Sequence, residues 1–445
     1  MRVLPLLLMI ALSACATAMA PINAPLSGFR APVEARQAQG EDLIVLALSG
    51  GGARAASFEL GVLQYLRETP GRDGRPLSEH VALVTAVSGG AVLAAYYGLH
   101  GDEGLDAFRA AYLDQSWRLN GLSSPSAWFG AVRGGMNRPD AGADWLDEHL
   151  YHGARMGEMG RGPRVVINAT DIYNSTPFAF TPVFFDAICS DLANIRVADA
   201  VSASMAVPVA FRPVLLQSHG RDCQAPAWVG RVRADRAAPE LVRATGRAFE
   251  NYAGASPADQ RFLYLADGGV IDNFGVTSLS ILRAAGPAPA PLTVREAVQA
   301  RRILFLVVNS ERERPRTFQQ RAGDLGGYEM VYAPLDASTD AAKRAALDAF
   351  AGSLRDLRTD LQSVRCALSP EQLAALRGAG GGWDCNAIDL SLETISLRDL
   401  DEAQQRALID TATDVSLPRE RVDALIAAGR SVAAGNAAIR SLQRD

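Results

Sequence analysis

The chain has 445 residues, of which 48% are hydrophobic and 21% charged, and its formal net charge is −5. This composition is typical of a globular protein with a large core and excludes a disordered chain. The mild negative charge and the absence of a long basic run in the sequence give nucleic-acid binding no support.

The first residues indicate an export signal. Residues 3–12 are apolar apart from Pro5, and they are too few to span a bilayer, which takes about 20 residues, but suit a signal peptide. Small residues then precede Cys15, and this pattern resembles the bacterial lipoprotein box. The resemblance implies a signal peptide at 1–14, lipidation of Cys15 and, since no Asp follows Cys15, the periplasmic side of the outer membrane. The alternative is an ordinary secretory signal cut after Ala20.

The chain after the signal begins with a segment of little periodicity. Residues 15–41 are rich in Ala and Pro, which predicts a tether between the lipid and the folded part. The continuous apolar run at 43–48 ends in glycines, the pattern of a buried parallel strand. Similar patterns predict strands at 81–87, 164–170, 178–185, 262–266 and 303–309, and helices at 56–67 and 91–99.

Strands that alternate with helical segments predict an α/β fold, with a mostly parallel central sheet and helices on both faces. We expect this domain to occupy residues 42–315. Its long connection at 214–261 predicts one helix, near 240–251. Residues 316–445 predict a mostly helical extension packed on the domain, with one late strand at 387–395. The helices of the extension are expected at 341–364, 370–377, 402–412 and 418–440.

Four cysteines remain after Cys15. They allow three pairings, and an even number outside the cytoplasm favours disulfides. We predict the pairing that is local in sequence, Cys189 with Cys223 and Cys366 with Cys385. No metal site is expected, because the chain has no CxxC pair and no nearby set of histidine ligands.

The first residue to indicate chemistry is Ser88. It lies between an apolar run of strand type and a helical segment. Glycines directly after such a serine let the helix start close to the strand and keep the hydroxyl accessible, as in a nucleophile elbow. The alternative is a serine that only caps the helix. The elbow would comprise Ala86, Val87, Gly89 and Gly90.

A glycine-rich turn follows the strand at 43–48. Its backbone N–H groups are of the kind that hold an oxyanion. Phosphate binding is the rival interpretation, but a P-loop needs Gly-Lys-Ser/Thr at its end. A dinucleotide fingerprint is met only loosely, because Ala55 takes the place of a glycine and the expected acid would fall near Asp73, in a turn. The turn comprises Gly50, Gly51, Gly52, Ala53 and Arg54.

A nucleophilic serine needs a base, and the chain has five histidines, none of them after His219. A triad in the order Ser, acid, His would have to end at or before His219, around which no known motif is found. Asp267 is the better candidate, because it ends an apolar strand, where open α/β sheets keep their sites. A carboxylate in contact with the hydroxyl can serve as the base. Gly268 and Gly269 follow, so the segment is also compatible with a plain turn.

Five motifs in this order resemble those of the patatin-like phospholipases, and together they cover about residues 42–310. The resemblance implies a three-layer sandwich and a dyad without histidine, in which Ser88 is the nucleophile and Asp267 the general base. It also implies that the amides of Gly51 and Gly52 are oxyanion donors and that Arg54 steadies their loop. The motifs are Gly50-Gly51-Gly52-Ala53-Arg54, Val87-Ser88-Gly89-Gly90, Asn168-Ala169-Thr170-Asp171, Ala203-Ser204-Met205-Ala206-Val207-Pro208 with Phe211-Arg212-Pro213, and Asp267-Gly268-Gly269.

Three positions depart from the family's pattern. Ala86 and Ala55 replace glycines, and Gly275 stands where many members have proline. None of these changes removes a catalytic side chain, but Ala55 and Ala86 leave the geometry of the two glycine motifs open.

The sequence thus predicts a membrane-anchored serine acyl hydrolase of the phospholipase type, acting through an acyl-enzyme without metal or cofactor. Its expected partners are a membrane lipid, as substrate, and the membrane itself through lipidated Cys15. Two alternatives stay open. One is a catalytically silent protein of the same fold that binds lipid or a partner in the bacterial envelope. The other is an esterase for small soluble esters.

Overall fold

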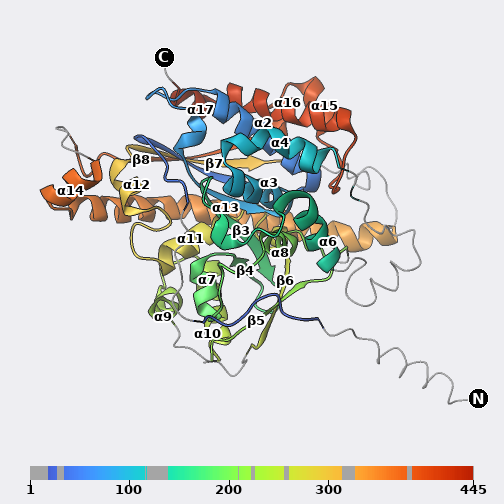
Figure 1. Cartoon of the computed structure of the whole chain (residues 1–445), viewed down its shortest axis with the longest axis horizontal. Coiled ribbons are helices and arrows are strands. Elements are labelled where there is room, and N and C mark those ends of the chain that lie inside the picture. The colour runs from blue at the N-terminus through green and yellow to red at the C-terminus, as the bar shows by residue number, and fades with distance from the viewer. Residues whose placement is uncertain are drawn as a thin grey trace, which may run out of the picture.

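The computed structural model describes residues 19–27, 35–115, 117, 139–208, 210–221, 226–254, 260–312, 326–377 and 383–443. One sheet runs through the molecule with helices on both of its faces (Figure 1). The strands are β1 (Asp42–Leu48), β2 (Val81–Val87), β3 (Arg164–Asp171), β4 (Thr176–Ala179), β5 (Val214–Gln217), β6 (Phe262–Asp267), β7 (Arg302–Asn309) and β8 (Asp389–Ser396).

The sheet is mostly parallel, as the sequence predicted. Its strands lie in the order β5-β6-β3-β2-β1-β7-β8, and β4 pairs with β3. From β3 to β8 every neighbour is parallel, whereas β4 and β6 run antiparallel to β3. Every residue of β1 and β2 is buried, which explains their continuous apolar runs, because a parallel strand in the middle of such a sheet is covered on both faces.

The helices form the outer layers. In Figure 1, α2 and α16 lie on one side of the sheet and α11 and α13 on the other. The longer helices are α2 (Gly52–Glu68), α3 (Ser88–His100), α6 (Pro139–Leu146), α8 (Val197–Ser204), α9 (Ala227–Ala234), α10 (Glu240–Tyr252), α11 (Val276–Ala285), α13 (Gly327–Cys366), α14 (Pro370–Arg377) and α16 (Arg419–Gly435). The shorter ones are α4 (Leu105–Phe108), α7 (Pro182–Ala187), α12 (Val294–Gln299), α15 (Glu402–Leu408) and α17 (Ala437–Ser441).

The C-terminal region is built into the sheet. β8 pairs in parallel with β7 along its whole length, from Asp389 opposite Arg302 to Ser396 opposite Asn309. α16 packs closely on α2. A Cβ added to Gly429 would lie only 1.9 Å from the carbonyl oxygen of Phe58, so the two helix backbones approach each other at this glycine. The region therefore extends the sheet and covers the helix that follows the glycine-rich turn.

Several elements differ from the prediction. The segment at 178–185, expected as one strand, is the end of β4 followed by α7, whose first residue is Pro182. Proline is well suited to the first turn of a helix, where no N–H partner is needed. The connection at 214–261 contains β5 and α9 in addition to the predicted helix. The expected helix at 418–440 is divided at Asn436, whose side chain accepts a hydrogen bond from Ile439 N–H and so caps α17.

The described parts of the expected tether, residues 19–27 and 35–41, lie against the fold. Ile22 N–H donates to the carbonyl oxygen of Leu215 in β5 at 3.0 Å. The Asn23 side chain accepts from Gln217 N–H at 2.8 Å and donates to its carbonyl oxygen at 2.9 Å. An edge strand such as β5 offers unpaired backbone groups that an extended segment can bind. Cys15, where lipidation is predicted, lies outside the described residues.

One of the two predicted disulfides is present. Cys366 and Cys385 are bonded, with their Cα atoms 5.0 Å apart, and they join the end of α13 to the segment before β8. Cys189 is disulfide-bonded as well, but Cys223 lies outside the described residues, so its pairing stays a prediction. Within the described ranges, no helix has both the length and the apolar character needed to cross a membrane.

Candidate active site

Ser88 occupies the turn between β2 and α3. Its φ of +51° is unusual for a residue with a side chain, and such strained turns present a serine at the end of a strand. Its backbone N–H donates to Ser204 Oγ at 2.8 Å, and Ser204 Oγ donates to the carbonyl oxygen of Asn168 at 2.6 Å. The turn is thereby held by α8 and β3.

Asp267 ends β6 and meets Ser88. The Ser88 hydroxyl lies close enough to its carboxylate to lower the pKa of that carboxyl, and the carboxylate accepts a hydrogen bond from Gly269 N–H at 2.7 Å. The backbone of Asp267 is fixed as well. Its carbonyl oxygen accepts a hydrogen bond from Thr170 Oγ1 at 3.0 Å, and its N–H donates to the carbonyl oxygen of Ala206 at 2.9 Å. The structure thus brings together the two side chains that the sequence singled out.

The protonation of Asp267 suits a base. Burial raises the pKa of Asp267 to about 6, because a carboxylate that loses its water shell is harder to ionise. The hydrogen bonds from Ser88 and Gly269 and the positive charge of Lys343 act in the opposite direction. A carboxylate with this pKa is largely ionised at neutral pH and is a stronger proton acceptor than an ordinary aspartate.

The glycine-rich turn lies directly beside the serine. An ideal Cβ on Gly50 would be 3.2 Å from Ser88 Cβ, and one on Gly89 would be 2.1 Å from the carbonyl oxygen of Gly52. A side chain at position 89 would clash with the backbone of Gly52, and one at position 50 would clash with Asn273 Oδ1, 2.4 Å from the added Cβ, so the close approach of the two motifs requires glycine. Gly51 and Gly52 have φ values of +152° and +62°, which glycine adopts readily.

The N–H groups of the turn divide into two kinds. Those of Gly50 and Ala53 donate to backbone carbonyl oxygens at 3.2 and 2.7 Å. Between them, the N–H groups of Gly51 and Gly52 have no acceptor in the part of the chain that the structure describes. Two such donors next to a serine hydroxyl are what an oxyanion hole requires.

Arg54 fastens the turn to later parts of the chain. Its side chain is buried, with Nε donating to the carbonyl oxygen of Ser310 at 2.6 Å. Its Nη1 donates to the carbonyl oxygen of Thr411 at 2.8 Å and to Thr413 Oγ1 at 2.9 Å. The carbonyl oxygen that accepts from Ala53 N–H belongs to Asp414. The segment at 411–414 therefore supports the turn together with the residue that follows β7.

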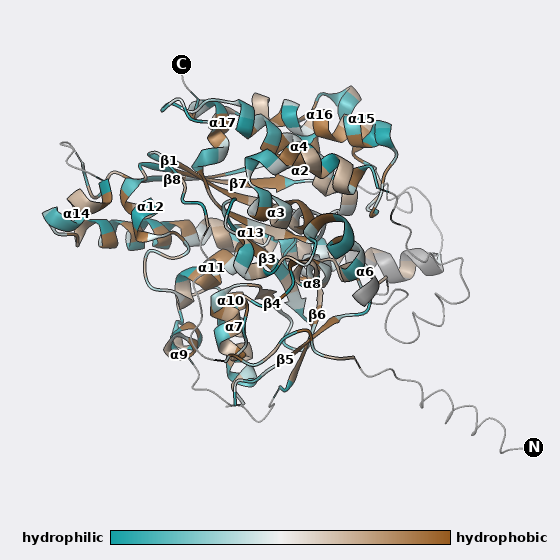
Figure 2. Cartoon of the chain, in the orientation of Figure 1, coloured by the Kyte–Doolittle hydropathy of each residue, from teal (hydrophilic) through white to brown (hydrophobic). Residues whose placement is uncertain are grey.

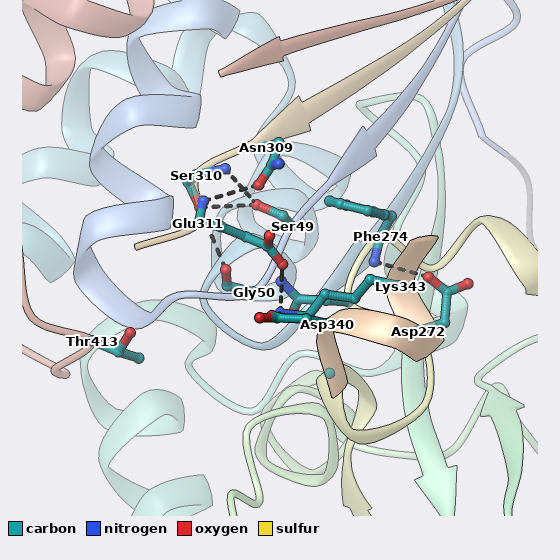
Figure 3. Close-up of polar contacts among 12 residues, drawn as sticks. Ser49, Gly50, Asp272, Phe274, Asn309, Ser310, Glu311, Asp340, Lys343 and Thr413 are labelled. Carbon is teal, nitrogen blue, oxygen red and sulfur yellow. Dashed lines mark hydrogen bonds and ion pairs between the residues drawn. The ribbon is translucent and has the colours of Figure 1, made fainter. Parts of the chain in front are cut away.

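A second group of supporting residues lies behind the turn (Figure 3). Ser49 Oγ and Ser310 Oγ are 2.8 Å apart, and Ser310 N–H donates to Ser49 Oγ at 2.9 Å. Ser49 Oγ is also within 3.3 Å of Glu59 in α2. Burial raises the pKa of Glu59 well above its usual value, which favours a neutral carboxylic acid at this place. Sequence reasoning missed these residues, and the only available signal was that β1 and β7 both end in Ser-containing turns.

Lys343 is the chain's only lysine and reaches the same edge of the sheet from α13 (Figure 3). Its Nζ lies 2.6 Å from Glu311 and 3.4 Å from Asp340. Glu311 also accepts a hydrogen bond from the Asn273 side chain at 3.2 Å. The ammonium group is thus held close enough to Asp267 to lower the pKa of that carboxyl.

The three departures from the family pattern are accommodated. Ala55 lies inside α2 and Ala86 inside β2, both buried, and neither has a positive φ. Gly275 has a φ of +67°, which the ring of a proline cannot adopt. The chain turns there because Asp272 accepts hydrogen bonds from Gly275 N–H at 3.0 Å and from Thr277 N–H at 2.7 Å.

The other candidate residues do not join the site. His219 follows β5 at the edge of the sheet, and its N–H donates to the carbonyl oxygen of Ile188 at 2.8 Å. The carboxylate beside the Ser88 hydroxyl is that of Asp267. Across the described ranges, no three His, Cys, Asp or Glu residues gather in a way that would hold a metal ion.

Comparison with known proteins connects this site to a family. The model of the family described as patatin-like phospholipase matches residues 46–280. Among solved structures, human GIVD cytosolic phospholipase A2 is similar with 13% identity and a TM-score of 0.35, over 90% of this chain and 62% of that chain. VipD from Legionella pneumophila has 14% identity and a TM-score of 0.30, over 97% of this chain and 73% of its own. No curated protein matches the sequence significantly.

Proposed function

This chain belongs to the patatin-like phospholipase family, a family of lipid acyl hydrolases, because more than half of it matches the family model, and from that premise we propose that it hydrolyses ester bonds of membrane lipids with Ser88 and Asp267. The observation that carries the proposal is the position of the Ser88 hydroxyl beside the buried Asp267 carboxylate, where it lowers the pKa of that carboxyl. This arrangement supplies a nucleophile and a base side by side.

The first step forms an acyl-enzyme. Ser88 Oγ attacks the ester carbonyl carbon while its proton passes to the Asp267 carboxylate. The carbonyl oxygen becomes negatively charged and is stabilised by the N–H groups of Gly51 and Gly52. When the tetrahedral intermediate collapses, the bond to the lipid alcohol breaks and that alcohol takes the proton from Asp267.

The second step releases the fatty acid. Asp267 takes a proton from water, and the resulting hydroxide attacks the acyl carbon. The bond between that carbon and Ser88 Oγ then breaks, and Oγ recovers the proton from Asp267. A general base typically contributes about 10²–10⁴-fold to the rate, and one oxyanion donor about 10²–10³-fold.

The same proposal includes anchoring in the bacterial envelope. It is supported by the signal-like residues 1–14 and by Cys15 after small residues. A single acyl chain binds a membrane only marginally, so stable anchoring requires more than one chain on Cys15. We place the enzyme at the outer membrane, on its periplasmic side.

A fluorophosphonate probe tests the catalytic proposal. Wild type is expected to be labelled, Ser88→Ala to be unlabelled, and Asp267→Asn to react at least about 10²-fold more slowly because the base is lost. Ser363→Ala is the matched control, since Ser363 is an exposed serine of α13. Wild type that stays unlabelled in the presence of phospholipid vesicles would contradict the proposal and favour a silent lipid-binding protein. Equal turnover of dispersed and vesicle-bound esters would indicate an esterase for soluble substrates.

A further inference from the structure

Large apolar side chains are exposed together at one end of the sheet. They belong to Ile172 and Tyr173, which follow β3, and to Phe262 and Tyr264 of β6, and each is 45–60% exposed. These four are the majority of the seven large apolar side chains that are exposed in the described part of the chain. We call them the apolar patch.

The pairing of the strands brings three members of the patch together. Asp171 lies opposite Leu265, and one step further Ile172 N–H donates to the carbonyl oxygen of Tyr264 at 3.1 Å. Residues directly opposite in an antiparallel pair place their side chains on the same face. Phe262 is two positions from Tyr264 and so shares that face. Figure 2 shows apolar residues along β5 and β6 at this end of the molecule.

The patch adjoins the candidate active site. Asp267 is paired with Ala169, three positions before Ile172 on β3. At about 3.3 Å per residue, the patch begins roughly 10 Å from the Asp267 backbone. Asp267 is an odd number of positions from Phe262 and Tyr264, so its carboxylate lies on the opposite face of β6. A lipid that leaves a bilayer at the patch would therefore reach Ser88 by passing around the end of β3.

The N-terminal segment is bound at the same end. Leu215 and Gln217, which bind Ile22 and Asn23, lie opposite Tyr264 and Phe262 in the β5–β6 pair. The described chain begins at residue 19, four positions after Cys15. Four residues span at most about 14 Å. A lipid on Cys15 would thus hold this end of the fold close to the membrane surface.

We propose that the apolar patch inserts into the interface of a phospholipid bilayer and positions the Ser88 site over it, an inference that rests on the proposed lipid hydrolysis. Tyrosine rings suit this place, because their apolar bodies enter the acyl boundary while their hydroxyl groups stay at head-group level. Arg261 is exposed next to Phe262 and can extend its guanidinium group towards lipid phosphates.

The test uses the double variant Phe262→Ser and Tyr264→Ser in a full chain that also carries Cys15→Ser, so that no lipid anchor hides the effect. Binding to vesicles of phosphatidylethanolamine and phosphatidylglycerol is measured by flotation, together with hydrolysis of vesicle lipid and of a soluble ester. Vesicle binding and hydrolysis of vesicle lipid are expected to fall at least about tenfold, since the variant has lost two aromatic rings whose transfer from water into the bilayer favours binding. Soluble ester turnover and probe labelling of Ser88 should match those of Cys15→Ser alone.

Val294→Ser is the matched control, because Val294 is exposed to 41% but lies in α12, outside the patch. Unchanged vesicle binding in the double variant would overturn the inference. So would an equal loss of soluble ester turnover, which would mean that the substitutions act on the site itself. A concentration-dependent dimer that Cys15→Ser forms and the double variant does not form would also overturn the inference. The patch would then be a contact between two copies of this chain. Failure of the proposed function is distinguishable, because then wild type hydrolyses neither ester while vesicle binding still responds to the patch.

Discussion

The serine turn and the glycine-rich turn lie side by side, yet different parts of the chain hold them. Ser88 is held by Ser204 and Asn168, both within the stretch that matches the family model. The glycine-rich turn has one bond to Asn273, within that stretch, and is otherwise held by residues that follow it, namely Ser310, Thr411, Thr413 and Asp414. The proposed nucleophile and base are thus held within the family-matched stretch, whereas the proposed oxyanion donors depend largely on the C-terminal region.

Arg54→Met is expected to have the largest effect on this comparison. It removes three of the hydrogen bonds that fasten the glycine-rich turn, so we expect kcat to fall by about 10²–10³-fold, as for the loss of an oxyanion donor. Steady-state hydrolysis of a soluble ester measures it. The kcat of Arg54→Lys should lie between those of wild type and Arg54→Met, because a lysine keeps the charge but not the planar set of donors. Wild-type kcat in Arg54→Met would show that the C-terminal region does not control the turn.

Ser204→Ala tests the other side of the comparison. Ser88 N–H loses its acceptor, while β2 and the Asp267 contact continue to hold the serine. An unsatisfied buried donor costs about 1–3 kcal/mol, so we expect a decrease of about tenfold in the rate of probe labelling. The labelling rate should recover in part in Ser204→Thr, which keeps a hydroxyl. A loss of activity in Ser204→Ala larger than that in Arg54→Met would mean that the support of the serine turn matters more than the support of the glycine-rich turn.

The Cys366–Cys385 disulfide separates local support from general stability. It belongs to the C-terminal region and closes a loop over a sequence separation of 19. The double variant Cys366→Ser and Cys385→Ser is expected to lose about 3 kcal/mol of unfolding free energy with unchanged kcat, measured by denaturant unfolding and ester hydrolysis. A drop in kcat at temperatures where the variant stays folded would contradict this separation, because it would mean that the disulfide supports the site within the folded protein.

Lys343 connects the two regions, since it belongs to the C-terminal region but lowers the pKa of Asp267, the proposed base. As the proposed base, Asp267 must be ionised to act, so kcat/KM is expected to fall as the pH drops below about 6. The charge of Lys343 lowers the pKa of Asp267, so Lys343→Met should raise that pKa and move the acid limb of the pH profile to higher pH. Lys343→Arg keeps the charge and should keep the profile. An acid limb that moves to lower pH in Lys343→Met would contradict this account.

The two turns also differ in how much of their structure could be predicted from the sequence. β1 and β2 were predicted to within a residue because continuous apolar runs bounded by glycines have few other interpretations. Ser88 and Asp267 follow from such strand ends. The supports at Thr411 and Asp414 could not be predicted, because they accept hydrogen bonds through backbone oxygens, which leave no residue-type signal. The strand expected at 178–185 failed for a similar reason, since an apolar run alone does not distinguish β4 from α7.

The hydrogen bond between Arg54 and Thr411 joins residues 357 positions apart. Contacts between such distant residues form late in folding, because the intervening chain must first be ordered. A growing polypeptide contains Ser88 and Asp267 long before it contains Thr411, so the hydroxyl and the carboxylate can meet while the glycine-rich turn is still unfastened. The proposed activity therefore requires residues 411–414, and a fragment that ends before them would carry the proposed nucleophile without the supports of the proposed oxyanion hole.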